Sequence, residues 1–305
     1  MISPNLEEVS FVRTLGGARS RKNNLGRDEK RNKKMNIKNI ALAGVALCGT
    51  VFCGAVLANS VESSNIVGYS GIPVTQGQFY MVGVQFENAT TGAANTFNSL
   101  LKMQGISACS YDDMYTEGAE IQILVDGAYK KYYFINDAYD SNENAVDGDV
   151  WADEDGYVIT DADALELGNG FWFRALKCES GAMLNAAGQV SADSSVTLSF
   201  PGGKSFAIIA PPFPKAVSLG DVTTTGASAV AYDEMYDSGA EIQVYVNGGY
   251  NKYYYINDAY DSSENEVNGD VWADEDGYLV EDDMIQVGTS IWIRSPNAGT
   301  ITFNL

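Results

Sequence analysis

The 305-residue chain contains one sequence block twice, at an offset of 121 residues. Tyr111-Asp-Asp-Met-Tyr115 returns as Tyr232-Asp-Glu-Met-Tyr236, and the segment 150–157 returns unchanged at 271–278. Because each copy of an internal repeat must form one structural unit, the period constrains the fold more than any other feature. We place the two units at 62–186 and 187–305. Any site within the matched block is expected twice.

A secretion signal is predicted at 35–58, ahead of the repeats. Lys38 supplies a positive charge, an apolar run follows from Ile40 to Leu57, and small residues favour cleavage after Ala58. The alternative is a transmembrane anchor near the minimum spanning length. Residues 1–34 are polar and basic without apolar periodicity, which indicates a mis-assigned start or an extended n-region, and we expect them to form no part of the globular fold.

Removal of residues 1–58 makes the remaining chain strongly acidic. That segment holds 10 of the 19 basic and 4 of the 40 acidic residues, so 9 basic and 36 acidic residues remain, with a formal net charge of −27. Nucleic acid and anionic membrane surfaces would be repelled by this charge. With no second apolar stretch long enough to span a membrane, we expect an exported protein of the periplasm, cell surface or extracellular space. Its expected partners are cell-envelope components or glycans.

A tight hairpin is the clearest structural signal in each copy. The β-rich segments 119–125 and 128–135 flank Asp126-Gly127, and the second copy has Asn247-Gly248 at the equivalent place. Both residue pairs suit a type I′ turn, which needs positive φ at its two central positions. With that turn, Ile121 lies on the face assigned to the core, and Tyr129 and Tyr133 lie on the other face.

The rest of the chain also has the pattern of strands. Short helices are expected only at 96–102 and 161–165. The sequence therefore predicts an all-β fold of two tandem β-sandwich- or barrel-like repeat units with Asp-Gly and Asn-Gly hairpins.

Acidic loops follow the hairpins. Residues 137–155 contain many carboxylates and no Lys or Arg, and the second copy repeats the pattern. Carboxylates held this close repel one another unless water or a cation separates them, and Ca²⁺ prefers such oxygen ligands. Ala145 stands where an EF-hand needs Gly, so any calcium geometry is irregular; the alternative is a solvated acidic loop. The candidate metal ligands are Asp137, Asp140, Asn144, Asp149, Asp153, Asp155, Asp258, Asp261, Asn265, Asp270, Asp274 and Asp276.

Aromatic residues accompany the acidic loops. Trp151, Tyr133, Trp272 and Tyr254 are candidate ligand-binding residues, because aromatic rings beside Asp and Asn suit glycans. The competing interpretation, which we favour, is that they fill small β cores. Trp172 and Arg174 lie two residues apart on one strand, as do Trp292 and Arg294. They therefore point the same way, so that the guanidinium can stack on the indole.

Two cysteines follow the signal, Cys109 and Cys178, both in the first copy. Because exported chains meet oxidising conditions, a Cys109–Cys178 disulfide is one expectation, and two buried free thiols are the other.

Histidine is absent from the sequence, which removes every His-dependent triad and every His-ligated metal. A glycosidase with paired carboxylates is a remote alternative. We therefore assign no catalytic residue and expect a protein that is not an enzyme.

The signal, the Asn65-Ile-Val-Gly-Tyr69 opening and the Gly-x-x-hydrophobic-Trp-hydrophobic-Arg strands resemble uncharacterised exported bacterial tandem-repeat β proteins. The resemblance covers most of the chain after the signal and implies a β-rich envelope or secreted protein, without catalytic or binding residues. The leading hypothesis is a non-enzymatic repeat protein of the bacterial envelope or surface, structural or adhesive and stabilised by calcium. The alternative is a secreted glycan-binding module.

Overall fold

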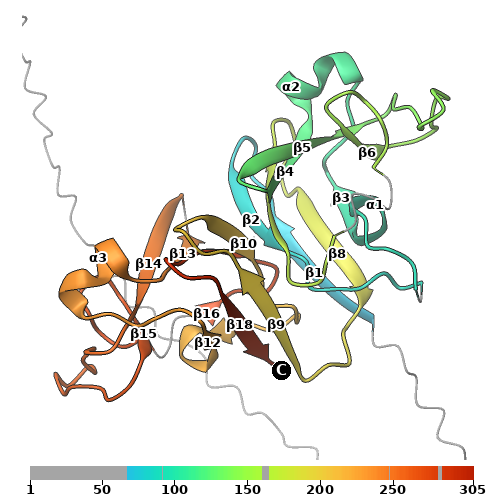
Figure 1. Ribbon diagram of the computed structural model, residues 1–305. Coiled ribbons are helices and arrows are strands. Elements are labelled where there is room, and N and C mark those ends of the chain that lie inside the picture. Colours follow the sequence, from blue (N-terminus) through green and yellow to red (C-terminus); the bar gives the residue numbers. More distant parts are fainter. Residues whose placement is uncertain (1–66, 91, 160–164, 247, 281–283) are drawn as a thin grey trace, which may run out of the picture. The chain divides into compact units, whose positions relative to one another are not determined.

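The computed structural model describes residues 67–90, 92–159, 165–246, 248–280 and 284–305 (Figure 1). The segments 1–34 and 35–58 lie outside the described residues, as does 161–164 of the second predicted helix. The described chain is all-β, with antiparallel sheets and a few single-turn helices. In this part of the chain, no helix has the length and apolar character needed to cross a membrane.

The first copy forms a five-stranded and a three-stranded sheet. The larger sheet has the order β2 (Phe79–Gly83), β7 (Gly170–Ala175), β4 (Ala119–Val125), β5 (Ala128–Ile135) and β6 (Val150–Asp153). The smaller has the order β1 (Val67–Pro73), β8 (Met183–Gln189) and β3 (Leu101–Gln104). The short helices are α1 (Phe97–Leu100), the 3-10 turn η2 (Tyr111–Asp113) and α2 (Met114–Glu117). The helix predicted at 96–102 is found only as α1, because Leu101 and Lys102 already belong to strand β3. The Thr96 side chain caps α1 by accepting from the Ser99 backbone amide.

The second copy has the same strand order. Its larger sheet runs β10 (Phe206–Ile209), β17 (Ile291–Arg294), β13 (Glu241–Val246), β14 (Gly249–Ile256) and β15 (Val271–Ala273). Its smaller sheet runs β9 (Ser195–Phe200), β18 (Gly299–Asn304) and β12 (Thr223–Thr225). Additional elements are the pair β11 (Val217–Ser218) and β16 (Met284–Ile285), with η4 (Leu219–Asp221), η5 (Tyr232–Glu234) and α3 (Met235–Ser238). The division that we placed at 186–187 falls inside β8, which pairs with β1 and β3, so the strands of the first copy extend to Gln189.

Strands β4 and β5 pair through a two-residue turn. Val125 lies opposite Ala128, and the turn residues Asp126 and Gly127 have φ of 50° and 79°. This is the left-handed region that Gly and Asp tolerate better than most residues. In the second copy Gly248 has φ of 87°, while Asn247 lies outside the described residues.

Each five-stranded sheet packs one face against a main apolar core. In the first copy Ile121 and Phe173 point into this core, where they meet Trp151. In the second copy the equivalent residues Ile242 and Ile293 are fully buried. The alternation predicted for the hairpin therefore holds where the strand is covered, whereas Val125 at the hairpin end is exposed.

The opposite face of each sheet carries a buried carboxylate. Glu120 on β4 is 3% exposed; one of its oxygens accepts from the Gln122 amide and the other from Arg174 on the neighbouring strand β7. In the second copy Glu241, 1% exposed, is held in the same way, and the Arg294 Nε lies 2.6 Å from its carboxylate. On burial, each carboxylate thus loses its hydrogen bonds to water and gains charge-assisted hydrogen bonds to the protein.

The arginines stack on phenylalanine and not on tryptophan. The guanidinium carbon of Arg174 lies 4.4 Å from the Phe79 ring centroid, and that of Arg294 lies 5.4 Å from Phe206. The expected stacking on the indoles is therefore wrong. In each case the phenylalanine lies directly opposite the arginine on the paired edge strand, which brings the ring within reach.

The two copies contact each other through equivalent positions. Val82 of β2 forms an isolated bridge with Thr289, and Ile209 of β10 forms the corresponding bridge with Asn169. Val82 and Ile209 occupy the same place in their sheets, as do Asn169 and Thr289 in the sequence repeat. The contact is therefore reciprocal.

Removing one arginine of a buried pair should cost far more stability than breaking an exposed pair. Arg294→Met leaves Glu241 buried without its counter-ion, and we expect a loss of about 3–5 kcal/mol in the free energy of unfolding. The control is Lys177→Met, which breaks the 2.8 Å pair with Glu117 between side chains that are 67% and 46% exposed. That change should cost at most about 1 kcal/mol. Urea unfolding measures both, and equal losses would contradict the structural role assigned to the buried pair.

Candidate functional site

The acidic loops are organised by carboxylates that accept hydrogen bonds from the loop backbone. Asp140 Oδ1 accepts from the amides of Asn142 at 2.8 Å and Asn144 at 2.9 Å, and the Asn144 side chain donates to Oδ2 at 3.0 Å. Asp261 makes the same bonds in the second copy, with Ser263 and Asn265. These are Asx turns, in which a side chain replaces a backbone acceptor.

The hydrogen bonds also set the acidity of these two residues. The side-chain bond from Asn144, followed by the backbone bonds from Asn144 and Asn142, lowers the pKa of Asp140 below its ordinary value. The bonds from Asn265 and Ser263 lower the pKa of Asp261 in the same way. Donors aimed at the ionised form favour it, so both carboxylates are charged at neutral pH.

Two further carboxylates per copy act similarly. Asp153 Oδ1 accepts from the amides of Asp155 at 3.0 Å and Tyr157 at 2.8 Å, and Asp137 Oδ1 accepts from the Tyr111 amide at 2.7 Å. The second copy repeats each bond within about 0.1 Å, through Asp274 and Asp258. The acidic residues thus tie the loop to itself and to η2.

Most of the residues predicted to bind a metal take part in hydrogen bonds within the protein. Asp137, Asp140 and Asp153 and their equivalents bind backbone amides, and Asn144 and Asn265 donate to a carboxylate. Asp155 and Asp276 contribute backbone amides, while Asp149 and Asp270 are exposed. Within the described ranges, no group of three or more Cys, Asp and Glu side chains is arranged to hold a metal ion. Calcium binding by these loops stays a prediction.

The four aromatic residues proposed as ligand-binding lie in the interior. Trp151, Tyr133, Trp272 and Tyr254 are 1%, 2%, 3% and 2% exposed. Burial raises the pKa of Tyr254 to about 12, with a further contribution from the charge of Glu241. Burial and the charge of Glu120 raise the pKa of Tyr133. In this structure none of the four rings can stack on a sugar, and the core interpretation fits their environment.

Exposed aromatic surface lies elsewhere. Tyr129, on the outer half of β5, is 41% exposed and lines a pocket of about 670 Å³ together with Phe206 and Trp292. Sequence reasoning placed Tyr129 on the non-core face of its hairpin but did not connect it with the two residues from the second copy. No local sequence signal links segments so far apart.

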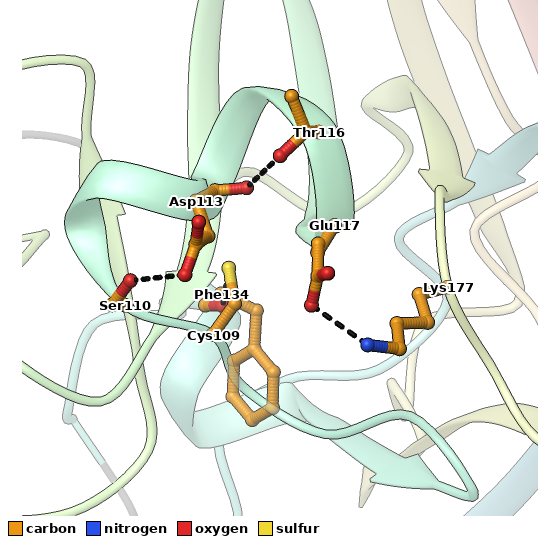
Figure 2. A network of polar contacts seen from close by, with 7 residues as sticks. All are labelled: Cys109, Ser110, Asp113, Thr116, Glu117, Phe134 and Lys177. Atoms are coloured by element: carbon orange, nitrogen blue, oxygen red, sulfur yellow. Dashed lines mark hydrogen bonds and ion pairs between the residues drawn. The ribbon is translucent and has the colours of Figure 1, made fainter.

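A second, smaller pocket of about 390 Å³ is lined by both cysteines, Cys109 and Cys178. Both thiols are free in this structure, so the predicted disulfide is not formed in it. Figure 2 shows Cys109 near Asp113 of η2 and Glu117 of α2, with Glu117 paired to Lys177. Burial is the main cause that raises the pKa of Cys109, and the nearby carboxylates add to it. The reactive thiolate is therefore disfavoured at neutral pH.

Removing the Asn144 side chain should raise the pKa of Asp140 and leave Asp261 unchanged. In Asn144→Ala the carboxylate loses its largest stabilising contact, and Asn265→Ala is the matched change in the second copy. A folded-state pKa below the unfolded value of about 3.9 stabilises the fold above that value, and the stabilisation is lost as pH falls through the folded pKa. Each variant should therefore be less stable than the parent at neutral pH, and the deficit should shrink in strong acid.

NMR titration of the side-chain carboxyl carbons measures the two pKa values separately. A shift of Asp261 in Asn144→Ala, or no shift of Asp140, would contradict the local origin of the effect.

The chain matches no protein-family model, no curated protein and no solved structure at significant similarity.

Proposed function

We propose that the chain is a non-enzymatic exported repeat protein of the bacterial envelope or surface, with a structural or adhesive role. We propose further that its two copies act as tandem β-sandwich- or barrel-like units. The observation that carries the proposal is the use of the duplicated acidic residues: both copies employ the same carboxylates to close the same turns. The two copies therefore share a set of hydrogen bonds that holds the loops, which we call the structural frame. A single catalytic centre would give no reason to preserve that frame twice.

The carboxylates that are buried also have structural partners. Glu120 and Glu241 are each hydrogen-bonded to an arginine and a glutamine. A glycosidase needs one carboxyl group that can donate a proton and another that remains a free base or nucleophile. Together with the absence of His, this engagement favours a role without catalysis.

Protease treatment of intact producing cells tests the location and the role together. We expect the exported chain to begin at Asn59, to be cleaved from outside, and to be required for attachment of the cells to a surface. Purified protein should leave polysaccharides intact. Polysaccharide turnover that persists through purification and disappears when one carboxylate pair is replaced in a variant that still folds would replace the adhesive proposal with the glycosidase. A chain retained inside the cell would also overturn the proposal.

Calcium is a separate part of the proposal, motivated by the density of carboxylates in both loops. Millimolar Ca²⁺ should raise the Tm more than NaCl of equal ionic strength. An ion that binds only the folded state stabilises it by about 2.7 kcal/mol at a hundredfold excess over Kd. Replacing Asp153 and Asp155 with Asn should remove part of the effect, and the same changes at Asp274 and Asp276 should remove the rest. Equal stabilisation by NaCl would show that the loops are only screened.

A further inference from the structure

The pocket of about 670 Å³ is built by both copies. One wall is the end of the β4–β5 hairpin, with Asp126 and Tyr129, and the other is formed by the β9–β10 segment, with Ser205 and Phe206. Trp292 of β17 also contributes to the lining. The volume is within the range of about 300–1,000 Å³ that is usual for small-molecule sites.

The aromatic rings of this pocket are packed against one another and against neighbouring side chains. Burial raises the pKa of Tyr129, and a side-chain hydrogen bond with Trp172 offsets part of that rise. Phe206 packs edge-on against Trp292, with ring centroids 5.0 Å apart, and the Arg294 guanidinium lies over the Phe206 ring. Trp292 in turn lies 6.4 Å from Trp172. The rings therefore form a fixed apolar surface, and a ligand that stacks on it orders few side chains.

Polar groups surround this surface. Asp126 offers a carboxylate at the hairpin turn, Asn169 an amide, and Ser199 and Ser205 offer hydroxyl groups. The pocket also contains Lys204, but its ammonium group donates to the backbone carbonyl of Asp237. The pocket thus presents both donors and acceptors, and among its described lining residues the one cation is already bound to the protein.

This combination selects one class of ligand. A pyranose ring has an apolar C–H face that stacks on aromatic rings and a rim of hydroxyl groups that both donate and accept. An anionic ligand would meet the Asp126 carboxylate and a chain of net charge −27 after signal removal. We infer that the chain binds a neutral oligosaccharide in this pocket, stacked on Tyr129 and Trp292. The inference adds a class of ligand to the proposed adhesive role. It rests on that role only for the location at which the protein meets the sugar.

The test is a titration of the purified full chain with three neutral hexasaccharides, namely cellohexaose, laminarihexaose and chitohexaose, after a screen on a neutral glycan array. Tryptophan fluorescence reports binding directly, because Trp292 lines the pocket. We expect saturable binding of at least one hexasaccharide. Tyr129→Ala should weaken it about tenfold, the effect of losing about 1.4 kcal/mol of stacking. Tyr129→Phe keeps the ring and should bind like the parent.

Tyr278→Ala is the matched control, since Tyr278 is 40% exposed and lies outside this pocket. It should leave the affinity unchanged, and circular dichroism should show that all three variants are folded. The inference is overturned if no neutral glycan on the array binds, or if Tyr129→Ala and Tyr278→Ala bind equally well. Because these measurements use purified protein, an absence of sugar binding would not change the results of the export and attachment experiments. Conversely, failure of attachment leaves sugar binding measurable.

Discussion

Each large sheet is organised around one buried carboxylate. An ionised glutamate inside a protein is destabilising by several kcal/mol unless it is paired and hydrogen-bonded. Glu120 meets that requirement only when β4 lies beside β7 in the observed register, with Arg174 directly opposite. A slip of β4 by one residue would turn Glu120 away from the face that carries Arg174 and would turn Ile121 out of the core. The ion pair and the core therefore select the same register, and Glu241 repeats the arrangement in the second copy.

The sequence predicted those parts of the fold that depend on neighbouring residues. The Asp126-Gly127 turn and the pairing of Val125 with Ala128 follow from backbone sterics at two positions. The short helix α1 lies within the segment 96–102, where a helix was expected, and the Thr96 side chain closes its start. In each case the deciding interactions lie within a few residues along the chain, where a sequence pattern carries the information.

The site was harder to predict because tertiary contacts decide it. Alternation along β5 placed Tyr129 and Tyr133 on one face but could not show that Tyr115 from α2 covers Tyr133, with ring centroids 5.2 Å apart, and leaves Tyr129 exposed. The acidic loops were interpreted from their charge. Their hydrogen bonds depend on loop geometry, which directs Asp140 and Asp153 toward backbone amides. The pocket joins Tyr129 with Trp292 from the other copy, a juxtaposition that no pattern within one copy contains.

The reciprocal bridges Val82–Thr289 and Ile209–Asn169 give the duplicated chain the contact geometry of a symmetric dimer. Two separate copies of one unit would have to find each other by diffusion and would dissociate on dilution. Here five residues, 190–194, connect β8 to β9. The short connection turns association into an intramolecular step, with an effective concentration on the order of millimolar at any dilution. A pocket assembled from both copies therefore persists at concentrations where a dimer of this kind would have come apart.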